Sequence, residues 1–345
     1  MNLYKLIGKR LSDEAGRSNI HPEAIAADIG EDVSRILSLF AGKPGFDIDL
    51  VEKVCSRLGI NPFWVLSKEY SPSKVHFRNL NSAGRSSARK VEQAFYLVAE
   101  YLPTPEVLDI APPDRSLKEQ GVMSGQISNI SESIKEIGYT PESIFRRINL
   151  PIIPVKADDF DAFLLCTENK YAVCVNSETA PVRIIFSLLH ELAHFLFHRD
   201  TEVSPLKGYR RFNQYLTEDE MVEFESDKFA QHFLVPFKQA EKWAVQYPNV
   251  DPDDIQPVVD QSRTSRDVLA YAIHDQLMFR NKDVTPTEVK GHLEQIGIKH
   301  GPAGSIHLFL NEQKELIRNI LHIYTNDFSE NVLKNTLLSL DLENG

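Results

Sequence analysis

One apolar stretch of the chain carries polar residues whose types and spacing suit metal chemistry. Residues 183–198 read RIIFSLLHELAHFLFH, in which His190, Glu191 and His194 form the pattern His-Glu-x-x-His. Helical residues four apart lie on one face, with Cβ atoms about 5–6 Å apart. The imidazoles of His190 and His194 can therefore reach one zinc ion at about 2.0–2.1 Å. The pattern predicts a metal site; the alternative is a core in which the three polar side chains satisfy one another.

Glu191 lies one residue further round the helix than His190, so it is poorly placed to be a third ligand. Its carboxylate can instead reach a water molecule at the metal. Zinc lowers the pKa of such a water toward about 7, and a nearby carboxylate can take its proton. We therefore predict Glu191 as the general base of a catalytic site. In a core without a metal, the same buried carboxylate would be costly unless other groups compensated it.

A catalytic zinc needs a third protein ligand and one open position, and the next predicted helix offers that ligand. Residues 217–236 read TEDEMVEFESDKFAQHFLVP, beginning with a capping-box pattern and ending at a proline. Glu223 and Asp227 lie four apart on one face of this helix. We predict Glu223 as the metal ligand and Asp227 as the hydrogen-bond partner of a ligand histidine. Glu225, on a different face, is the alternative ligand.

Further side chains near these helices have less distinctive positions. His198 continues the histidine row, but eight residues after His190 an α-helix has rotated by about 80°. We therefore predict that His198 either supports a ligand histidine or has a purely structural role, and that it is not itself a ligand. His232 could stabilise an oxyanion, although a core or surface histidine is the simpler interpretation. Cys166 and Cys174 alternate with apolar residues in predicted strands, and we expect both in the core.

A small sheet and a pair of helices must hold these residues in place. The strand patterns lie at 152–157, 160–166 and 171–176. TENK joins the last two strands as a hairpin, and an edge strand near residues 161–176 could pair with an extended peptide. Helical patterns lie at 182–198, at 218–235 and near 264–279. Pro181 suits a first helical turn, where its missing N–H costs nothing.

The segments outside this centre differ in character. Residues 1–70 form short helical patterns separated by Gly, Pro or Asn, with no strand pattern. Residues 71–91 contain five Lys or Arg and no acid, which indicates a basic linker, either a solvated hinge or an arm that contacts phosphate. Residues 281–345 combine one predicted strand, at 305–310, with amphipathic segments and have no assigned role.

Composition bounds the class of protein. The chain has 345 residues, 42% hydrophobic and 25% charged, which is enough for a sizeable core. A net charge of −11 argues against wholesale electrostatic binding to nucleic acid or to an anionic membrane. Three cysteines without a pairing pattern favour a reducing compartment. Because neither a secretory signal nor a membrane-spanning run is visible, we expect a cytoplasmic protein with no membrane partner.

The run from about Asp161 to Pro236 resembles the ImmA/IrrE family of metallopeptidases. The family's helix signature, Arg-x-x-Phe-x-x-x-His-Glu-Leu-x-His-x-x-x-His, is matched by Arg183, Phe186, His190, Glu191, Leu192, His194 and His198. Its second motif is matched by EFESDKFAQHFLVP, with departures at Ser226, Phe233 and Val235. Asn176 also matches, and Ala193 stands where the family has Gly. The resemblance implies that His190, His194 and Glu223 are zinc ligands and that Glu191 is the base.

Residues 3–66 resemble an XRE-type helix-turn-helix domain at Gly30, Gly42-Lys43, Leu58-Gly59 and Pro62-x-Trp64. The positions that would read DNA depart from that pattern: Pro22 replaces a usual Gln, and Glu31 and Asp32 open the recognition helix. The residues suited to DNA contacts are Ser34, Arg35 and Ser38. Residues 1–70 carry 9 basic and 10 acidic residues, which is a poor phosphate footprint. The domain could instead recognise a protein partner or form a homodimer.

These resemblances imply an α+β chain with four parts. They are an XRE-like helix-turn-helix bundle at 1–70, a basic linker at 71–91, a metallopeptidase domain at 92–280 and a C-terminal region at 281–345. The metallopeptidase domain would be zincin-like, a minimal gluzincin with a small sheet and the His-Glu-x-x-His helix. We expect one Zn²⁺ per chain; Mn²⁺ and Fe²⁺ remain open because His/His/Glu sites are not strictly zinc-selective.

The main functional hypothesis is a zinc endopeptidase of bacterial or phage origin. It would cleave a partner protein, such as a transcriptional repressor, and so control genes of stress response or of mobile elements. One alternative is a DNA-binding transcription regulator or antitoxin-like protein in which the metal-binding fold is a sensing or structural module. Another is a hydrolase that acts on a non-peptide substrate.

Overall fold

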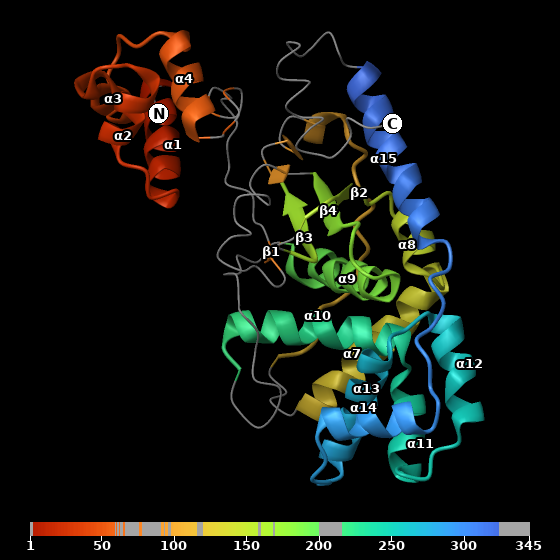
Figure 1. Cartoon of the computed structure of the whole chain (residues 1–345). Helices are drawn as coiled ribbons and strands as arrows, with labels where there is room; N and C mark the ends of the chain where they lie inside the picture. The colour runs from red at the N-terminus through yellow and green to blue at the C-terminus, as the bar shows by residue number, and fades with distance from the viewer. Residues whose placement is uncertain are drawn as a thin grey trace. The chain divides into compact units, whose positions relative to one another are not determined.

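The computed structural model of the chain describes residues 3–58, 60, 62, 65, 76–77, 91–92, 94–95, 98–115, 120–157, 160–167, 170–199 and 216–323 (Figure 1). The chain divides into two compact units. The first comprises Met1–Pro72, Arg89–Glu100 and Ile320–Gly345, and the second comprises Ser73–Ala88 and Tyr101–Asn319. Of the basic linker predicted at 71–91, residues 76–77 and 91 are described, and the rest lies outside the described residues.

In the part of the first unit from residue 3 to residue 58, helices pack around an apolar core of their own. They are α1 (Leu3–Arg17), α2 (Pro22–Ile29), α3 (Val33–Phe40) and α4 (Ile48–Leu58). Helix α2 ends at Gly30, whose φ of 69° is the left-handed conformation that glycine adopts without strain. Helix α3 begins after Asp32, whose carboxylate accepts a hydrogen bond from the backbone N–H of Ser34. Leu11, Ile25, Ile36 and Val54 are fully buried.

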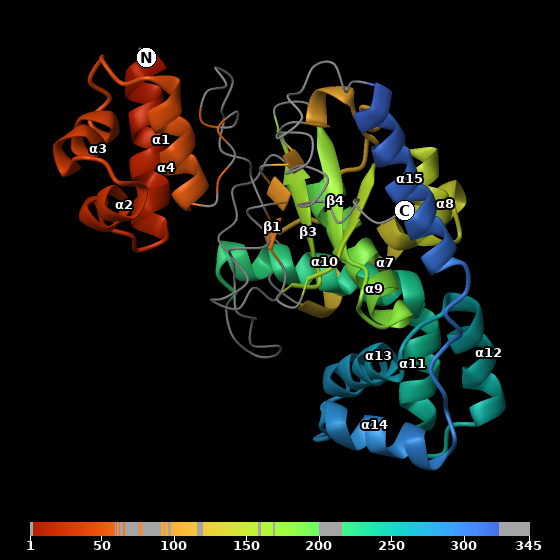
Figure 2. The same ribbon diagram turned by 45° about the horizontal axis from the view of Figure 1, so that its top comes forward.

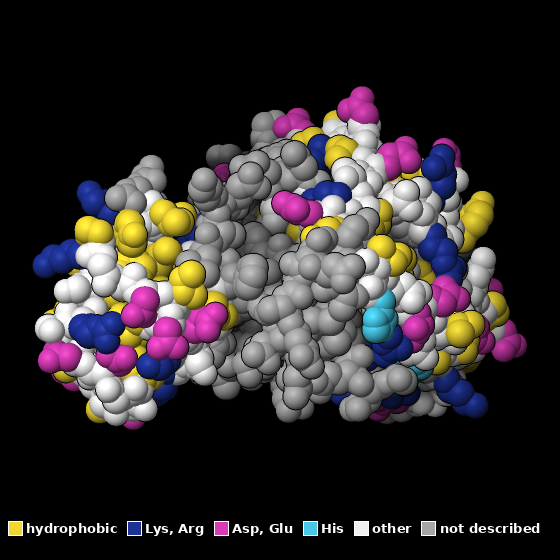
Figure 3. All heavy atoms as spheres, turned by 90° about the horizontal axis from the view of Figure 1, so that it is seen from above, with side chains coloured by type: hydrophobic (Ala, Val, Ile, Leu, Met, Phe, Trp, Pro, Cys, Tyr) yellow, Lys and Arg dark blue, Asp and Glu magenta, His cyan; other side chains and the backbone are white. Residues whose placement is uncertain are grey.

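Basic side chains on this unit lie against acidic neighbours. Arg57 pairs with Asp28, and Lys53 lies 2.9 Å from Asp49. In Figure 3 the surface of this unit mixes Lys and Arg with Asp and Glu and with apolar side chains. The face in that view therefore has no field of a single sign of the kind that attracts a phosphate backbone.

The second unit contains a small sheet in the strand order β1-β3-β4-β2. The strands are β1 (His76–Phe77), β2 (Ile152–Val155), β3 (Ala162–Cys166) and β4 (Tyr171–Asn176). Strands β3 and β4 form the predicted antiparallel hairpin, closed by a 2.8 Å hydrogen bond from the N–H of Thr167 to the carbonyl of Lys170. Strand β2 runs parallel to β4.

The prediction of an edge strand near residues 161–176 is wrong for β3 and β4, the two strands of that range. Strand β4 has a neighbour on each side, and β1 pairs with β3 at Phe163 and Leu164. The edges of the described sheet are β1 and β2. The cause is long-range pairing, because β1 comes from more than 80 residues upstream of β3 in the chain. Ile152 of β2 donates its N–H to the Gln313 side chain at 3.3 Å.

Of the two helices that carry the predicted metal residues, α9 (Pro181–Ala193) covers the sheet and α10 (Glu218–Leu234) lies beside α9. Helix α9 packs on β3 and β4, and α10 packs against α9 (Figures 1 and 2). Helix α7 (Gln120–Ile137) packs against α10 in turn. Between Ile184 and Leu196, Phe186 is the only residue that is not buried. Burial of an almost continuous apolar segment therefore fixes the position of the histidines.

The prediction of one α-helix through His198 is wrong at its end. The turn η2 (His194–His198) is π-helical. A π-helical turn holds more residues than an α-helical turn, so it rotates by fewer degrees per residue. His198 consequently lies nearer to the histidine row than the 80° rotation predicted for an uninterrupted α-helix.

Further described helices of the second unit are α8 (Pro141–Arg147), α11 (Phe237–Gln246), α12 (Pro252–Ser262), α13 (Arg266–Phe279), α14 (Pro286–Gln295) and most of α15 (Ile306–Ile323). The short η1 (Ala99–Tyr101) and the last residues of α15 extend into the stretches assigned to the first unit. The strand predicted at 305–310 is wrong, because those residues begin α15. Short apolar runs fit a strand or a buried helix equally well; here Ile306, Phe309 and Leu310 are buried at helical spacing.

Among the described residues, no helix is both long enough and apolar enough to cross a membrane.

The crossing of α1 and α3 gives a test of the packing in the first unit. A Cβ at Gly8 would lie 2.6 Å from the backbone nitrogen of Gly42 and still closer to the carbonyl of Leu39. Gly8→Ala should lower the free energy of unfolding of this unit by about 1–3 kcal/mol, because the backbones must separate. Thermal unfolding would measure this change.

The matched control is Gly16→Ala in the same helix, where a Cβ would meet no atom within 4 Å. This change should stabilise the unit by up to about 1 kcal/mol through helix propensity. Equal effects of the two substitutions would contradict the close approach at Gly8.

Candidate metal centre

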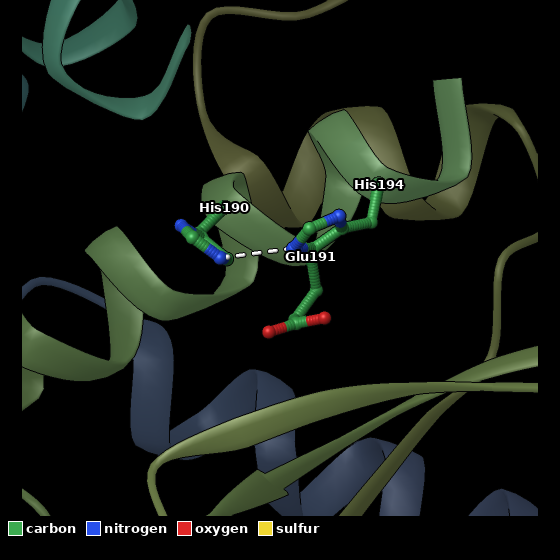
Figure 4. A group of neighbouring side chains, drawn as sticks. All are labelled: His190, Glu191 and His194. Carbon is green, nitrogen blue, oxygen red and sulfur yellow. Dashed lines mark hydrogen bonds between the residues drawn. The ribbon is translucent and has the colours of Figure 1, made fainter. Parts of the chain in front are cut away.

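Two histidine side chains on α9 and η2 approach each other in a buried position. The Nε2 atoms of His190 and His194 lie 3.0 Å apart (Figure 4). His190, Glu191 and His194 each offer one atom to a group whose members all lie within 4.8 Å of one another, and all three residues are buried. The predicted i, i+4 pair is therefore brought together.

Glu223 of α10 faces the same point. Its Oε2 lies 3.4 Å from Nε2 of His190, and its Oε1 lies 3.6 Å from Nε2 of His194. Two ligands held at about 2.0–2.1 Å in a tetrahedral arrangement would be about 3.3–3.4 Å apart. Separations of 3.0, 3.4 and 3.6 Å thus fit a single small cation between the three side chains.

Asp227 lies one turn after Glu223 on α10 and contacts the second ring nitrogen of His190. Its Oδ1 is 2.9 Å from Nδ1 of His190. A carboxylate accepts hydrogen bonds, so this contact assigns the imidazole proton to Nδ1 and leaves the lone pair of Nε2 directed toward Glu223 and His194. Asp227 therefore takes the place that its spacing from Glu223 predicted.

His194 is supported by a longer chain of groups. Its Nδ1 lies 3.2 Å from Nδ1 of His198 and 3.3 Å from Oγ of Ser226. His198 contacts Oε2 of Glu225 through its Nε2 at 2.6 Å. If the Nε2–H of His198 donates to Glu225, its Nδ1 accepts from His194, and the Nε2 lone pair of His194 again faces the ligand cluster.

In the series of groups from His194 through His198 to Glu225, the negative charge lies on Glu225. Burial lowers the pKa of His198, and the neighbouring Glu225 opposes that shift without overcoming it, so His198 is neutral near pH 7. Burial raises the pKa of Glu225, but the hydrogen bonds from His198 and Arg115 outweigh it and hold that pKa below its usual value. Glu225 is therefore a buried carboxylate engaged by His198 and Arg115, which disfavours it as the alternative ligand.

Arg115 is the residue of this site that the sequence did not reveal. Its Nε and Nη2 each lie 2.8 Å from a carboxylate oxygen of Glu225. Such a bidentate pair is a strong form of charge-assisted hydrogen bond. Arg115 lies in a proline-rich loop 110 residues before Glu225, with no periodic pattern. The local sequence offers only an arginine two residues after Pro112-Pro113 as a signal.

Glu191 extends from α9 on the side that faces the sheet (Figure 4). The side chain is fully buried. In β4, burial raises the pKa of the Cys174 thiol, and the negative charge of Glu191 raises it further, so the two groups are close neighbours. Cys166 and Cys174 are both buried, which confirms that they belong to the core.

His232 points elsewhere. Its Nε2 lies 2.6 Å from Oγ of Ser124 on α7. Burial lowers the pKa of His232 to about 3, so it is neutral at physiological pH. This geometry agrees with the interpretation of His232 as a core histidine, which links α10 to α7.

Asn176 and Arg183, two other residues of the family signature, fix the approach to α9. The Asn176 amide donates to the carbonyls of Ala157 and Phe160, and its oxygen accepts from the N–H of Glu178 at 3.0 Å. Arg183 pairs with Asp161 at 2.6 Å. Both residues thereby attach the segment between β2 and β3 to the start of the helix.

The three positions predicted to contact DNA lie in the first unit, apart from this centre. Ser34 and Arg35 are exposed, and Ser38 is half-buried. Arg35 lies 2.5 Å from Glu31 and 3.6 Å from Asp47. A phosphate would have to displace two carboxylates from this guanidinium.

Comparison with known families agrees with the geometry of the second unit. Residues 146–271 match the family model Peptidase_M78, described as the IrrE N-terminal-like domain. The match covers about a third of the chain and includes α9, η2 and α10. Searches of curated proteins and of solved structures gave no match. The family match supports a metallopeptidase of the ImmA/IrrE kind, and hence a protein substrate.

Asp227 gives a test of the support of His190. Asp227→Asn should weaken zinc binding by about 10–100-fold, because the amide no longer favours the Nδ1–H form of the imidazole as strongly. Competition against a chromogenic chelator would measure this affinity. Asp254→Asn on α12, where the carboxylate binds Lys242 at the surface, is the matched control and should leave the affinity unchanged. Equal affinities for the wild type and Asp227→Asn would remove Asp227 from the site.

Proposed function

We propose that this chain is a zinc-dependent endopeptidase of the ImmA/IrrE type that cleaves a partner protein. One observation carries the proposal: the Nε2 atoms of His190 and His194 and the carboxylate of Glu223 converge within 3.0–3.6 Å of one another. The match of residues 146–271 to the peptidase family model supports the same reading.

Convergence of these groups favours a bound cation. With their protons assigned to Nδ1, both imidazoles direct lone pairs at each other and at a carboxylate in a largely buried place. Such an arrangement is unfavourable without a compensating positive charge. Two nitrogens, one oxygen and an open fourth position form the donor set of a catalytic zinc site. The same set can accept Mn²⁺ or Fe²⁺.

The residues of the chain divide the chemistry between them. A zinc ion bound here would polarise the scissile carbonyl and lower the pKa of a water molecule. Glu191 is the general base that takes the proton of the attacking water, and it later delivers a proton to the leaving amine. Asp227 and His198 hold the two proposed ligand histidines in the form that leaves Nε2 unprotonated, and His198 and Arg115 keep Glu225 ionised.

The proposed substrate is a regulatory protein, such as a transcriptional repressor, whose cleavage releases the genes that it controls. The first unit, which we propose as an XRE-type helix-turn-helix domain, would recognise a protein partner. Acidic neighbours already pair with Arg35, Lys53 and Arg57. These pairs favour protein recognition over DNA binding, because each phosphate contact would have to replace an internal ion pair.

Binding to a random-sequence DNA duplex would test the role of this unit. We expect a dissociation constant weaker than about 10⁻⁴ M at physiological salt, the weak limit of ordinary non-specific binding. Fluorescence anisotropy at several salt concentrations would measure it. A micromolar dissociation constant would contradict a purely protein-binding unit, if the logarithm of the association constant also falls steeply as the logarithm of the salt concentration rises.

Glu191→Gln tests the mechanism itself. We expect cleavage of a proteome-derived peptide library, read by mass spectrometry, to fall by about 10²–10⁴-fold, the usual contribution of a general base. Bound zinc, measured by elemental analysis, should stay at one ion per chain, because Glu191 is not a ligand. Glu178→Gln, at an exposed glutamate just before α9, is the matched control. A Glu191→Gln protein with wild-type cleavage would refute the mechanism.

A further inference from the structure

A cavity of about 390 Å³ lies beside the candidate metal centre, in the same unit. It is bounded by α9, α10 and α13, and its wall includes Phe186, Asp227, Gln231, Val268 and Tyr271. We call it the α9–α13 pocket. Its volume falls within the range of about 300–1,000 Å³ that is usual for ligand sites.

The pocket and the metal centre share a wall. Asp227 lines the pocket and also contacts Nδ1 of His190. Phe186 precedes His190 by four residues, so the pocket lies about one helical turn, roughly 6 Å, along α9 from His190. Residues of an extended peptide are about 3.3 Å apart. A substrate with its scissile carbonyl at the metal would therefore bring a flanking side chain to this pocket.

Two apolar residues of the pocket are more exposed to solvent than the residues around them. Phe186 is half-buried, while every other residue from Ile184 to Leu196 is buried. Val268, in the first turn of α13, is also half-buried and packs at the margin of the core. Phe186 is thus a partly exposed aromatic ring in an otherwise buried stretch of helix, and it lines a cavity. Such a ring is suited to contact an apolar group of a ligand.

The charged residues of the wall already have partners within the protein. Arg183 binds Asp161, Lys228 binds Asp275, and Asp267 binds Lys290. Asp227 binds His190. A charged substrate side chain would have to compete with these internal pairs, whereas an apolar side chain would not.

The wall is also held rigidly. Lys228 and Gln231 of α10 both bind the buried carboxylate of Asp275 on α13, the Gln231 amide at 2.8 Å. These contacts tie two sides of the pocket together, so little ordering cost remains when a ligand enters.

We propose that the α9–α13 pocket binds a large apolar side chain of the substrate, aromatic or long aliphatic, at a position flanking the scissile bond. The proposal rests on the proposed peptidase function. It makes Phe186 and Val268 residues that determine which peptide bonds are cleaved.

Simple hydroxamates separate the pocket from the metal centre, because the hydroxamate group binds zinc and its substituent probes the wall. Zinc-loaded protein would be titrated calorimetrically with acetohydroxamate, propionohydroxamate and 3-phenylpropionohydroxamate. We expect the phenyl compound to bind at least about tenfold more tightly than propionohydroxamate, as burial of a phenyl group predicts.

Filling the pocket should remove this preference. Val268→Trp places a large ring within it, and Ala180→Phe does so from the exposed residue that precedes α9, where packing of the core is not disturbed. In both variants we expect the two compounds to bind within about twofold of each other. Val258→Trp, at a half-buried valine of α12 outside the pocket, is the matched control and should keep the wild-type ratio.

The outcomes distinguish the pocket from the function. If acetohydroxamate binds but the phenyl compound has no advantage, or if its advantage survives both fillings, the pocket proposal is overturned while the peptidase proposal stands. If the protein holds no zinc and binds no hydroxamate, the peptidase proposal fails and the pocket proposal falls with it. A preference that is lost in both filled variants and kept in Val258→Trp supports both.

Discussion

The second unit depends on one electrostatic constraint, the convergence of two imidazole lone pairs and a carboxylate between α9 and α10. Left alone, His190, His194 and Glu223 would repel one another, and water would enter between the helices. The fold instead presses them together, because nearly every residue from Ile184 to Leu196 is buried against the sheet and α10. The free energy of apolar burial thus offsets the repulsion between these groups. A bound cation would remove that repulsion, so cation binding and the packing of the two helices are energetically coupled.

The two histidines that we propose as ligands are oriented by different means. Asp227 contacts His190 directly at 2.9 Å and is partly open to solvent. His194 instead contacts the neutral ring of His198, with the charge one step further away on the fully buried Glu225. Burial alone would raise the pKa of Glu225, and the hydrogen bonds from His198 and Arg115 together hold it below its usual value. The π-helical turn η2 is part of this arrangement, because it brings His198 back toward the row of ligand histidines.

Helical periodicity made much of this site predictable. Spacing of four placed His190 with His194 and Glu223 with Asp227, because an α-helix fixes which residues share a face. Arg115 was missed because its contact with Glu225 spans 110 residues and follows no period. The expected edge strand failed for the same reason: β1 pairs from far upstream, and β2 pairs in parallel with β4. At 305–310, an apolar run too short to distinguish the two periods was assigned to a strand, and it lies in α15. Local pattern therefore predicts which groups share an element, whereas contacts between distant elements decide how those groups are supported.

Both units use much of their charge internally, and this has a consequence for recognition. In the first unit, Arg35, Lys53 and Arg57 face acids. Around the α9–α13 pocket, Arg183 and Lys228 do the same. Charged groups already paired within a protein contribute little to steering a partner over long distances. The apolar wall at Phe186 and Val268 is then left to discriminate by shape and desolvation, which act only at contact. For the proposed peptidase, selectivity of this kind would require the partner to present an extended segment at the candidate metal centre. Cleavage would then be confined to exposed or unfolded stretches of a substrate with a large apolar residue beside the bond.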